Sequence, residues 1–142
     1  MTRVYVDMVA DLFHYGHVEF LRQARALGDE LVVGIHSDET VASYKRRPLM
    51  TMAERIAVVA GCRYADEVVA DAPLVLDEAW LKGLRIDLVV HGDDFDIDMA
   101  TRLYGVAMSM GIFRTVPYTP AISTSDLLSR LRVRIEEEAE GS

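Results

Sequence analysis

The sequence is poor in cysteine and in positive charge, and it contains no long apolar run. Its single cysteine, Cys62, cannot form an intramolecular disulfide, which favours a reducing compartment and predicts a cytoplasmic protein. The 15 Lys and Arg residues against 23 Asp and Glu residues give a net charge of −8, which argues against binding to duplex nucleic acid. No stretch reaches the roughly 20 apolar residues of a membrane span, and the N-terminus lacks a signal-peptide pattern. We therefore expect an unprocessed soluble protein with neither a membrane nor a nucleic-acid partner.

Apolar residues make up 51% of the 142 residues, enough for the core of one domain. Short apolar segments alternate along the chain with segments of helical periodicity. Such alternation predicts an α/β fold, a single-domain Rossmann-like open sheet of five parallel strands with helices on both faces. We assign residues 1–135 to this domain and expect the acidic residues 136–142 to be a frayed, solvated tail. The expected strands are 3–7, 31–35, 66–69, 86–91 and 112–117, and the expected helices are 17–27, 51–60, 76–84, 98–110 and a last one that begins after 123.

The loops that follow these strands are where a ligand is expected. In open parallel sheets, ligands bind beyond the carboxyl ends of the strands, at the point where the strand order reverses. Four segments follow strands in this way and should share one edge of the sheet: 8–16, 37–48, 92–95 and 118–125.

The segment His14-Tyr15-Gly16-His17 lies between the first strand and the first helix. Two imidazoles at this spacing can reach one anion, and a helix start adds free N–H groups and the positive end of the dipole. Gly16 would allow a phosphate to come close. A capping histidine in an exposed loop and a metal pair are the alternatives. A structural zinc site is disfavoured, because Cys62, His36 and His91 lie in other segments.

Three further groups of polar residues lie on the same predicted edge. Ser123-Thr124-Ser125 form either a second phosphate-binding helix start or an ordinary helix cap. Lys45-Arg46-Arg47 form either a solvated loop or a clamp for an anion. Asp11 could hold a cation or orient His14, and the Asp93-Asp94 pair could contact a ribose, a base or a metal-bound phosphate, or cap its loop. No serine, threonine or cysteine is paired with a base, so an enzyme of this kind would act by direct phosphoryl or nucleotidyl transfer.

Two of these segments, Asp11-Leu12-Phe13-His14-Tyr15-Gly16-His17 and Ile122-Ser123-Thr124-Ser125, resemble the cytidylyltransferase family. That family has H-x-G-H after its first strand and R-T-x-G-[IV]-S-T-T before its last helix. The resemblance covers nearly the whole chain, is greatest for members that act on ethanolamine phosphate and is weaker for those that act on glycerol 3-phosphate. It implies transfer of CMP from CTP to a small phosphorylated alcohol, with release of pyrophosphate and with Mg²⁺ carried by the CTP phosphates.

The resemblance also implies roles for individual residues. His14, His17 and Lys45 would be catalytic, with the histidines donating hydrogen bonds to the α-phosphate. Asp11, Lys45 and Tyr118 would contact the acceptor, no residue would bind a metal, and a homodimer would form through residues 63–69. The residues that would contact the nucleotide are Val9, Ala10, Asp11, Phe13, Gly16, Arg55, His91, Gly92, Asp94, Thr119, Ile122, Ser123, Thr124 and Ser125.

The chain departs from the family pattern in two places. Met8-Val9-Ala10 replaces Gly-x-Phe, and Tyr118 and Ala121 stand where the signature has arginine and glycine. Either Arg114 or the Arg46-Arg47 pair compensates for the missing arginine, or the acceptor differs. A small phosphonate, hydroxyethyl- or aminoethylphosphonate, is therefore an alternative acceptor. The same fold and motifs also suit an ATP-dependent adenylyltransferase or a non-catalytic nucleotide-binding module.

Overall fold

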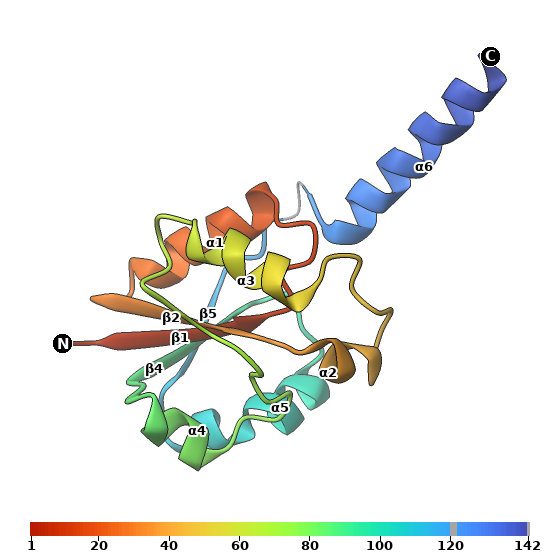
Figure 1. The fold of residues 1–142 in the computed structure, drawn as a ribbon. Helices are drawn as coiled ribbons and strands as arrows, with labels where there is room; N and C mark the ends of the chain where they lie inside the picture. The colour runs from red at the N-terminus through yellow and green to blue at the C-terminus, as the bar shows by residue number, and fades with distance from the viewer. Residues whose placement is uncertain (120–121, 142) are drawn as a thin grey trace.

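The computed structural model of the chain describes residues 1–119 and 122–141, which contain a five-stranded parallel sheet with helices on both faces (Figure 1). The strand order is β3-β2-β1-β4-β5, and every neighbouring pair is parallel. The predicted fold class is confirmed, with small shifts at the ends of the predicted elements. The strands are β1 (Arg3–Met8), β2 (Glu30–Ile35), β3 (Glu67–Val69), β4 (Leu88–Gly92) and β5 (Phe113–Val116).

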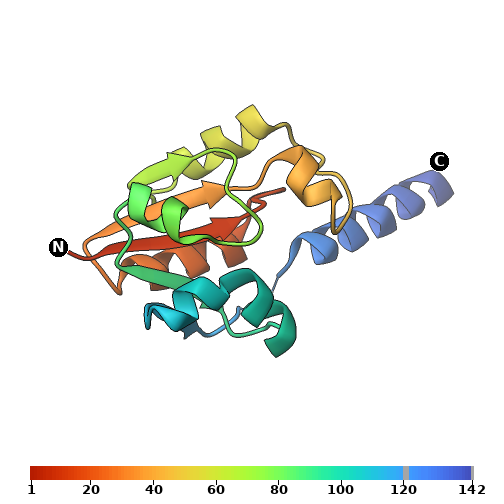
Figure 2. The ribbon, with the colours of Figure 1, turned by 90° about the horizontal axis from the view of Figure 1, so that it is seen from below.

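Helices α1 (Tyr15–Arg25) and α3 (Met52–Ala60) cover one face of the sheet, and α4 (Glu78–Gly83) and α5 (Ile97–Ser109) cover the other (Figures 1 and 2). The predicted cap of α3 is confirmed, because the Thr51 side chain accepts a hydrogen bond from the backbone N–H of Glu54 and Glu54 accepts one in return. Within the described residues, no helix is both long and apolar enough to cross a membrane.

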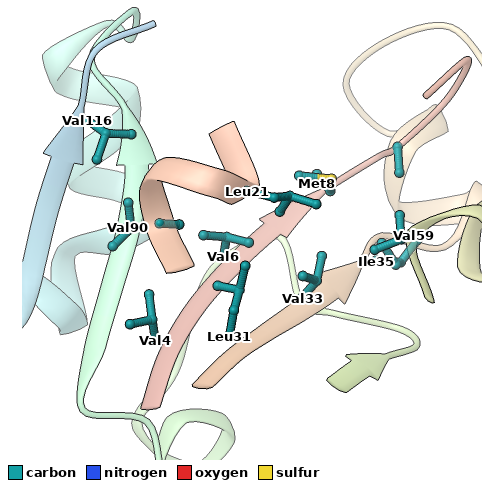
Figure 3. Close-up of a cluster of buried hydrophobic side chains, with 12 residues drawn as sticks. Val4, Val6, Met8, Leu21, Leu31, Val33, Ile35, Val59, Val90 and Val116 are labelled. Atoms are coloured by element: carbon teal, nitrogen blue, oxygen red, sulfur yellow. The ribbon is translucent and has the colours of Figure 1, made fainter. Parts of the chain in front are cut away.

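The central strand β1 divides its side chains between two cores. Val4, Val6 and Met8 point toward α1 and α3, where Leu21 completes the first core (Figure 3). Tyr5, one residue out of phase, lies in the second core against α4 and α5. Because side chains alternate along a strand, Asp7 shares the face of Tyr5 and is buried on that side. An ionisable residue is thus held inside the sheet, one residue before the strand ends.

The strand order reverses between β1 and β4. From β1 the chain crosses to β2 on one side, and it later returns to β4 on the other side. Loops that follow β1 and β4 therefore diverge and leave a crevice beyond the carboxyl ends of the strands. This is the predicted location of the ligand.

Two helices at this end of the molecule differ from the expectations. The short helix α2 (Asp38–Ala42), capped by Ser37, was not predicted and lies directly after β2. The expectation of a frayed tail was wrong, because α6 (Thr124–Glu140) runs without a break across residue 135. Alanine and glutamate, which predominate there, are strong helix formers. The tail is exposed as expected, and α6 points away from the sheet (Figures 1 and 2). Ser142, the last residue of the expected tail, lies outside the described residues.

Candidate active site

Two cavities open at the carboxyl ends of the strands. We call the first, of about 540 Å³, the basic cavity, because Lys45, Arg46 and Arg47 lie on its wall. We call the second, of about 410 Å³, the aromatic cavity; its wall includes His91 and Tyr104. The remaining residues around the basic cavity are Val9, Ala10, Asp11, His17, Pro48, Leu49, Thr124, Ser125 and Leu128.

Four residues line both cavities and form the boundary between them: Val9, His17, Lys45 and Thr124. They come from the β1–α1 loop, the first turn of α1, the loop after α2 and the first turn of α6. His14 and Gly16 lie beside this boundary on the wall of the aromatic cavity. A molecule that extends from one cavity into the other must pass an imidazole, an ammonium group and the start of α6.

His14 and His17 cap helix α1 in a reciprocal arrangement. Nδ1 of His14 accepts a hydrogen bond from the backbone N–H of Gly16 at 3.0 Å, and Nδ1 of His17 accepts one from the backbone N–H of His14 at 3.1 Å. Since each Nδ1 is an acceptor, the proton of each neutral ring is on Nε2. The two ring centroids are 4.0 Å apart. The pair therefore presents two neighbouring Nε2–H donors.

Both histidines are held in the neutral form. Burial lowers the pKa of His14, and burial lowers the pKa of His17 to about 4, with repulsion from His14 and Lys45 adding to the effect and Asp11 opposing it. Phe13 contributes to this burial because its ring stacks on that of His17, with centroids 5.2 Å apart. At neutral pH the two rings act as hydrogen-bond donors without a positive charge of their own.

Gly16 is required by packing. A Cβ at this position would lie 2.9 Å from Cε1 of His14 and 3.1 Å from the backbone oxygen of Ile122. The glycine lets the start of α1 pack against the segment that leads into α6, and the close approach of a phosphate expected at Gly16 stays a prediction. The histidine motif and the Ile122 to Ser125 segment are thus in direct contact.

Asp11 joins three loops of the site. Its carboxylate accepts hydrogen bonds from the backbone N–H groups of Leu49 at 2.9 Å and Met50 at 3.0 Å, and its backbone oxygen accepts one from the Thr124 hydroxyl at 3.1 Å. It lies on the wall of the basic cavity, but both of its carboxylate oxygens hold the 45–50 loop in place. The carboxylate does not hydrogen-bond to His14.

Arg55 lies beneath the site and lines neither cavity. It is 0% exposed, and its guanidinium group donates to the backbone oxygens of Val9 at 2.7 Å, His36 at 2.8 Å and Met50 at 3.3 Å. It also pairs with Asp38 at 2.6 Å. Its hydrogen bonds connect the loops after β1 and β2 to the segment before α3, so its position is that of a supporting residue rather than of a contact to the nucleotide.

The loop after β1 has an unusual backbone. Ala10 and Leu12 adopt left-handed conformations with φ of 61° and 49°. Each costs an L-residue about 1–2 kcal/mol, and such strain is typical of functional loops. Ala10 is buried, and Met8 packs beside Leu21 in the first core (Figure 3). The replacements of the family Gly-x-Phe therefore direct these two side chains largely into the protein.

The start of α6 contributes backbone donors. The Ser123 hydroxyl caps the helix by accepting a hydrogen bond from the backbone N–H of Asp126 at 3.0 Å, so the capping interpretation is correct for this residue. The Thr124 hydroxyl is bonded to Asp11, and Ser125 is exposed on the wall of the basic cavity. The first-turn N–H groups and the positive end of the α6 dipole remain for an anion.

The floor of the aromatic cavity holds a buried carboxylate that the sequence did not indicate. The Asp7 side chain is 2% exposed, and its Oδ1 accepts a hydrogen bond from the Tyr104 hydroxyl at 2.7 Å. Its Oδ2 has no hydrogen-bond partner among the described residues, and the His36 Nε2 atom lies 3.8 Å from it. Burial raises the pKa of Asp7, while His36 and Tyr104 oppose this rise. An unpaired buried carboxylate oxygen is costly unless a ligand supplies a donor.

The rim of the aromatic cavity comes from the ends of β4 and β5. Asp93 accepts a hydrogen bond from the backbone N–H of Tyr118 at 2.9 Å and so connects the two ends. His91 packs against Tyr104 with centroids 5.0 Å apart, and Asp94 lies beside Gly92, where a Cβ would come within 2.8 Å of its carboxylate. Among the described residues, no group of three or more His, Cys, Asp or Glu side chains could hold a metal ion.

The model of the family described as Cytidylyltransferase-like matches residues 8–130 of the chain. The chain belongs to this cytidylyltransferase-like family. A probable ethanolamine-phosphate cytidylyltransferase from Encephalitozoon cuniculi is 42% identical over 135 residues, which cover 94% of this chain and 42% of that protein. The ethanolamine-phosphate cytidylyltransferase from Dictyostelium discoideum is 44% identical over 130 residues, which cover 91% of this chain and 36% of that protein. The chain thus spans about two fifths of the length of these curated relatives.

A solved structure has a similar fold. The lipopolysaccharide core biosynthesis protein from Thermoplasma volcanium superposes with a TM-score of 0.68 at 25% identity, over 84% of this chain and 97% of that one.

Most of the residues predicted for the site of this cytidylyltransferase-like chain surround the two cavities. The exceptions are Phe13, which supports His17, and Arg55, which supports the loops; Ala121 lies outside the described residues. The residues that sequence reasoning missed are Asp7, His36, Tyr44 and Tyr104 of the aromatic cavity. The predicted residues that line one or both cavities are Val9, Ala10, Asp11, His14, Gly16, His17, Lys45, His91, Gly92, Asp94, Tyr118, Thr119, Ile122, Ser123, Thr124 and Ser125.

Proposed function

We propose that the chain is a CTP-dependent cytidylyltransferase that transfers CMP to a small phosphorylated alcohol with a cationic head, as in phosphoethanolamine, giving a CDP-alcohol and pyrophosphate. The observation that carries this proposal is the boundary between the cavities, where His17, Lys45 and Thr124 meet beside His14. Such a boundary suits the α-phosphate of a nucleotide, with the leaving group in the basic cavity and the nucleoside and the attacking acceptor on the side of the aromatic cavity. The names of the relatives favour CTP and an ethanolamine-phosphate acceptor.

The reaction needs no protein nucleophile. An oxygen of the acceptor phosphate forms a bond to the α-phosphorus, the bond from that phosphorus to the α,β-bridging oxygen breaks, and the electron pair leaves with pyrophosphate. The acceptor oxygen is already anionic, so no proton has to be removed. The Nε2–H groups of His14 and His17 donate to the α-phosphate oxygens as their charge shifts, and Lys45 neutralises charge between the two phosphates.

The acceptor head is the part of the substrate that the aromatic cavity selects. The unpartnered Oδ2 of Asp7 requires a donor, and an ammonium group supplies both a donor and a charge. Tyr104 and His91 surround that position with aromatic rings. This arrangement favours an amine head over the hydroxyl of glycerol 3-phosphate or hydroxyethylphosphonate. Aminoethylphosphonate keeps the amine, so it stays the alternative acceptor.

Mg²⁺ would enter with the nucleotide. Asp11 is the carboxylate on the wall of the basic cavity, and its two oxygens are occupied by backbone N–H groups. The donor set therefore fits a metal that is bound mainly by phosphate oxygens and water, as Mg²⁺ usually is. Bound there, the ion would neutralise charge on the β- and γ-phosphates.

We also propose a homodimer through residues 63–69. β3 is a three-residue strand at the edge of the sheet, and Arg63 and Tyr64 precede it with the guanidinium 5.6 Å from the ring centroid. Such an exposed edge can pair with a second copy. Sedimentation of the wild type and of a Tyr64→Asp variant tests this, and a monomeric wild type contradicts it.

The test of the proposed function is a screen for pyrophosphate release. CTP and ATP are each combined with phosphoethanolamine, phosphocholine, glycerol 3-phosphate, hydroxyethylphosphonate and aminoethylphosphonate. We expect release with CTP and an amine-headed acceptor. Turnover with ATP alone would indicate an adenylyltransferase, and tight CTP binding without turnover on any acceptor would indicate a non-catalytic nucleotide-binding module.

A further inference from the structure

The loop of residues 45–49, which we call the basic loop, is held at both ends beside the candidate site. The backbone N–H of Lys45 donates to the Val41 oxygen at the end of α2 at 3.0 Å, and the backbone N–H of Leu49 donates to the Asp11 carboxylate at 2.9 Å. Arg46 and Arg47 lie between these two anchors. The loop that carries their exposed side chains is therefore held close to the start of α1 and the start of α6.

These arginines differ from the paired arginines elsewhere in the chain. Arg3, Arg22, Arg25, Arg55 and Arg130 all form ion pairs with carboxylates. By contrast, no carboxylate of the described residues lies within 4 Å of a charged nitrogen of the basic loop. In a chain with a net charge of −8, a concentration of unpaired cations on one cavity wall indicates an anionic ligand.

The position of the basic cavity indicates which anion binds there. The basic cavity shares His17, Lys45 and Thr124 with the aromatic cavity, so its contents continue directly from the proposed α-phosphate. Ser125 on the opposite wall belongs to the first turn of α6, where N–H groups are free for an anion. The cavity of about 540 Å³ has room for two phosphate groups with their water.

No other cation of the described residues can fill this role from the cavity walls. Among the described residues, the only Lys and Arg side chains that line either cavity are those of Lys45, Arg46 and Arg47. Position 118, where the family signature has arginine, carries a tyrosine that lines the aromatic cavity. Arg114, the other candidate, is exposed on β5 and lines neither cavity.

We propose that Arg46 and Arg47 bind the β- and γ-phosphates of the nucleotide and hold the leaving pyrophosphate in the basic cavity. This rests on the proposed function, which supplies a nucleoside triphosphate. A guanidinium group matches two phosphate oxygens at once, so the pair can bind adjacent phosphates with four or more hydrogen bonds. The pair therefore replaces the signature arginine from the wall of the basic cavity, whereas position 118 lines the aromatic cavity.

The test compares ligands that do and do not reach the basic cavity. In the Arg46→Ser/Arg47→Ser variant we expect inorganic pyrophosphate and CTP to bind at least about tenfold more weakly in calorimetry, because charge-assisted hydrogen bonds are lost. CMP, which has no β- or γ-phosphate, should bind as it does to the wild type. The KM for CTP should rise in parallel with its dissociation constant.

A matched control removes the same two charges elsewhere. Arg102 and Arg114 are exposed, line neither cavity and form no ion pair with a carboxylate of the described residues, so Arg102→Ser/Arg114→Ser tests the effect of net charge alone. The Arg46→Lys/Arg47→Lys variant keeps the charge and should recover part of the affinity for pyrophosphate. Equal losses in the control and the test variant, or an equal loss of CMP and CTP binding, would overturn the proposal.

Failure of this proposal is distinguishable from failure of the proposed function. If the wild type releases pyrophosphate from CTP and the Arg46→Ser/Arg47→Ser variant keeps the wild-type KM for CTP, the arginines are not phosphate ligands and the cytidylyltransferase assignment stands. If the wild type binds pyrophosphate through these arginines but turns over no nucleotide, the binding site stands and the assigned reaction is wrong.

Discussion

The two cavities meet at His17 and Lys45, yet their walls have opposite charge and opposite exposure. The basic cavity carries its cations on an exposed loop, and each of those side chains is without a carboxylate partner among the described residues. Of the two carboxylates that line the aromatic cavity, Asp94 is exposed, whereas Asp7 is buried against Tyr104 and His36. The difference matches a substrate pair with a polyphosphate at one end and an ammonium group at the other, with the reacting phosphorus between them.

Solvent exposure also decides how strongly the charges on each cavity wall interact with a bound substrate. Charges in contact with solvent are screened, so the basic loop gains strength from several cations acting together. A buried charge is hardly screened, and a single carboxylate is then enough to select a cationic head. Substitutions can separate the contributions of the two cavities. The first perturbs Arg55, which supports both cavities, the next perturbs His14 at their boundary, and another perturbs Asp7 in the aromatic cavity.

The largest effect is expected from Arg55, whose loss would disturb both cavities. Arg55→Met leaves the backbone oxygens of Val9, His36 and Met50 and the Asp38 carboxylate without their donor. Removing one partner from a buried charged network costs about 3–5 kcal/mol of unfolding free energy. Urea unfolding measures this. Exposed Arg114→Met is the control and should change stability by less than about 0.5 kcal/mol, so equal losses in both would show that Arg55 supports nothing.

At the boundary, the role of His14 as donor can be separated from its role as helix cap. His14→Asn keeps a side-chain acceptor for the N–H of Gly16 but lacks the Nε2–H donor, whereas His14→Ala loses both. We expect kcat to fall about 10²–10³-fold in both variants, with little change in CTP affinity. His14→Ala alone should also lose about 1 kcal/mol of stability. Wild-type turnover by His14→Asn would refute the donor role.

On the aromatic side, Asp7→Asn should act only on acceptors with a cationic head. Loss of a charge-assisted bond predicts a fall of about 10–100-fold in kcat/KM for phosphoethanolamine. The kcat/KM for a neutral-headed acceptor such as hydroxyethylphosphonate should be unchanged or higher. Tyr104→Phe, which keeps the carboxylate and removes its hydroxyl partner, serves as the matched variant. A uniform fall for all acceptors in Asp7→Asn would show that Asp7 only supports the fold.

The smallest effect concerns the dependence of stability on pH. The folded-state pKa of His17 is about 4, below its ordinary value of 6.5, so between these values the unfolded state binds more protons. His17 therefore destabilises the fold as the pH falls from 6.5 toward 4 and has no such effect above 6.5. Asp7, whose pKa is raised by burial, acts in the opposite direction: the folded state binds its proton more tightly than the unfolded state does, so its contribution to stability falls as the pH rises. The free energy of unfolding in urea is measured at pH 7.5 and at pH 5 for the wild type and for His17→Gln. Between these two pH values it should fall less in the variant than in the wild type, and equal falls would contradict this.

Sequence reasoning located the residues whose position follows from the topology. His14, His17, Lys45 and Ser123 lie in segments that follow strands, although α2 comes between β2 and Lys45, and parallel strands end at one edge of the sheet. Their proximity could therefore be predicted without any knowledge of their contacts. The pairing of each Nδ1 with a backbone N–H could not, because it depends on the exact path of the chain at the start of α1.

The residues that were missed or misplaced depend on contacts between distant segments. Asp7 lies within an apolar segment and was assigned only to the strand, and its unsatisfied oxygen is visible only once Tyr104 and His36 are placed. Arg55 was expected near the nucleotide, yet four acceptors from three segments enclose it. The short helix α2 was too brief to show a period, although Ser37 at its start is a typical cap.

Helix α6 combines two parts that are under different constraints. Its first turn faces both cavities and is tied to Asp11, so a change there alters the site. From Ser129 to Gly141 every residue is exposed, and the family match ends at residue 130, close to the point where the helix leaves the body. Leu131, Val133 and Ile135 are among these exposed residues, so the outer part of α6 carries apolar side chains that the described fold does not bury. None of the described residues from Ser129 onward lines either cavity or belongs to either core, so labels or crosslinkers that should leave the site unperturbed are best attached along the outer turns of α6.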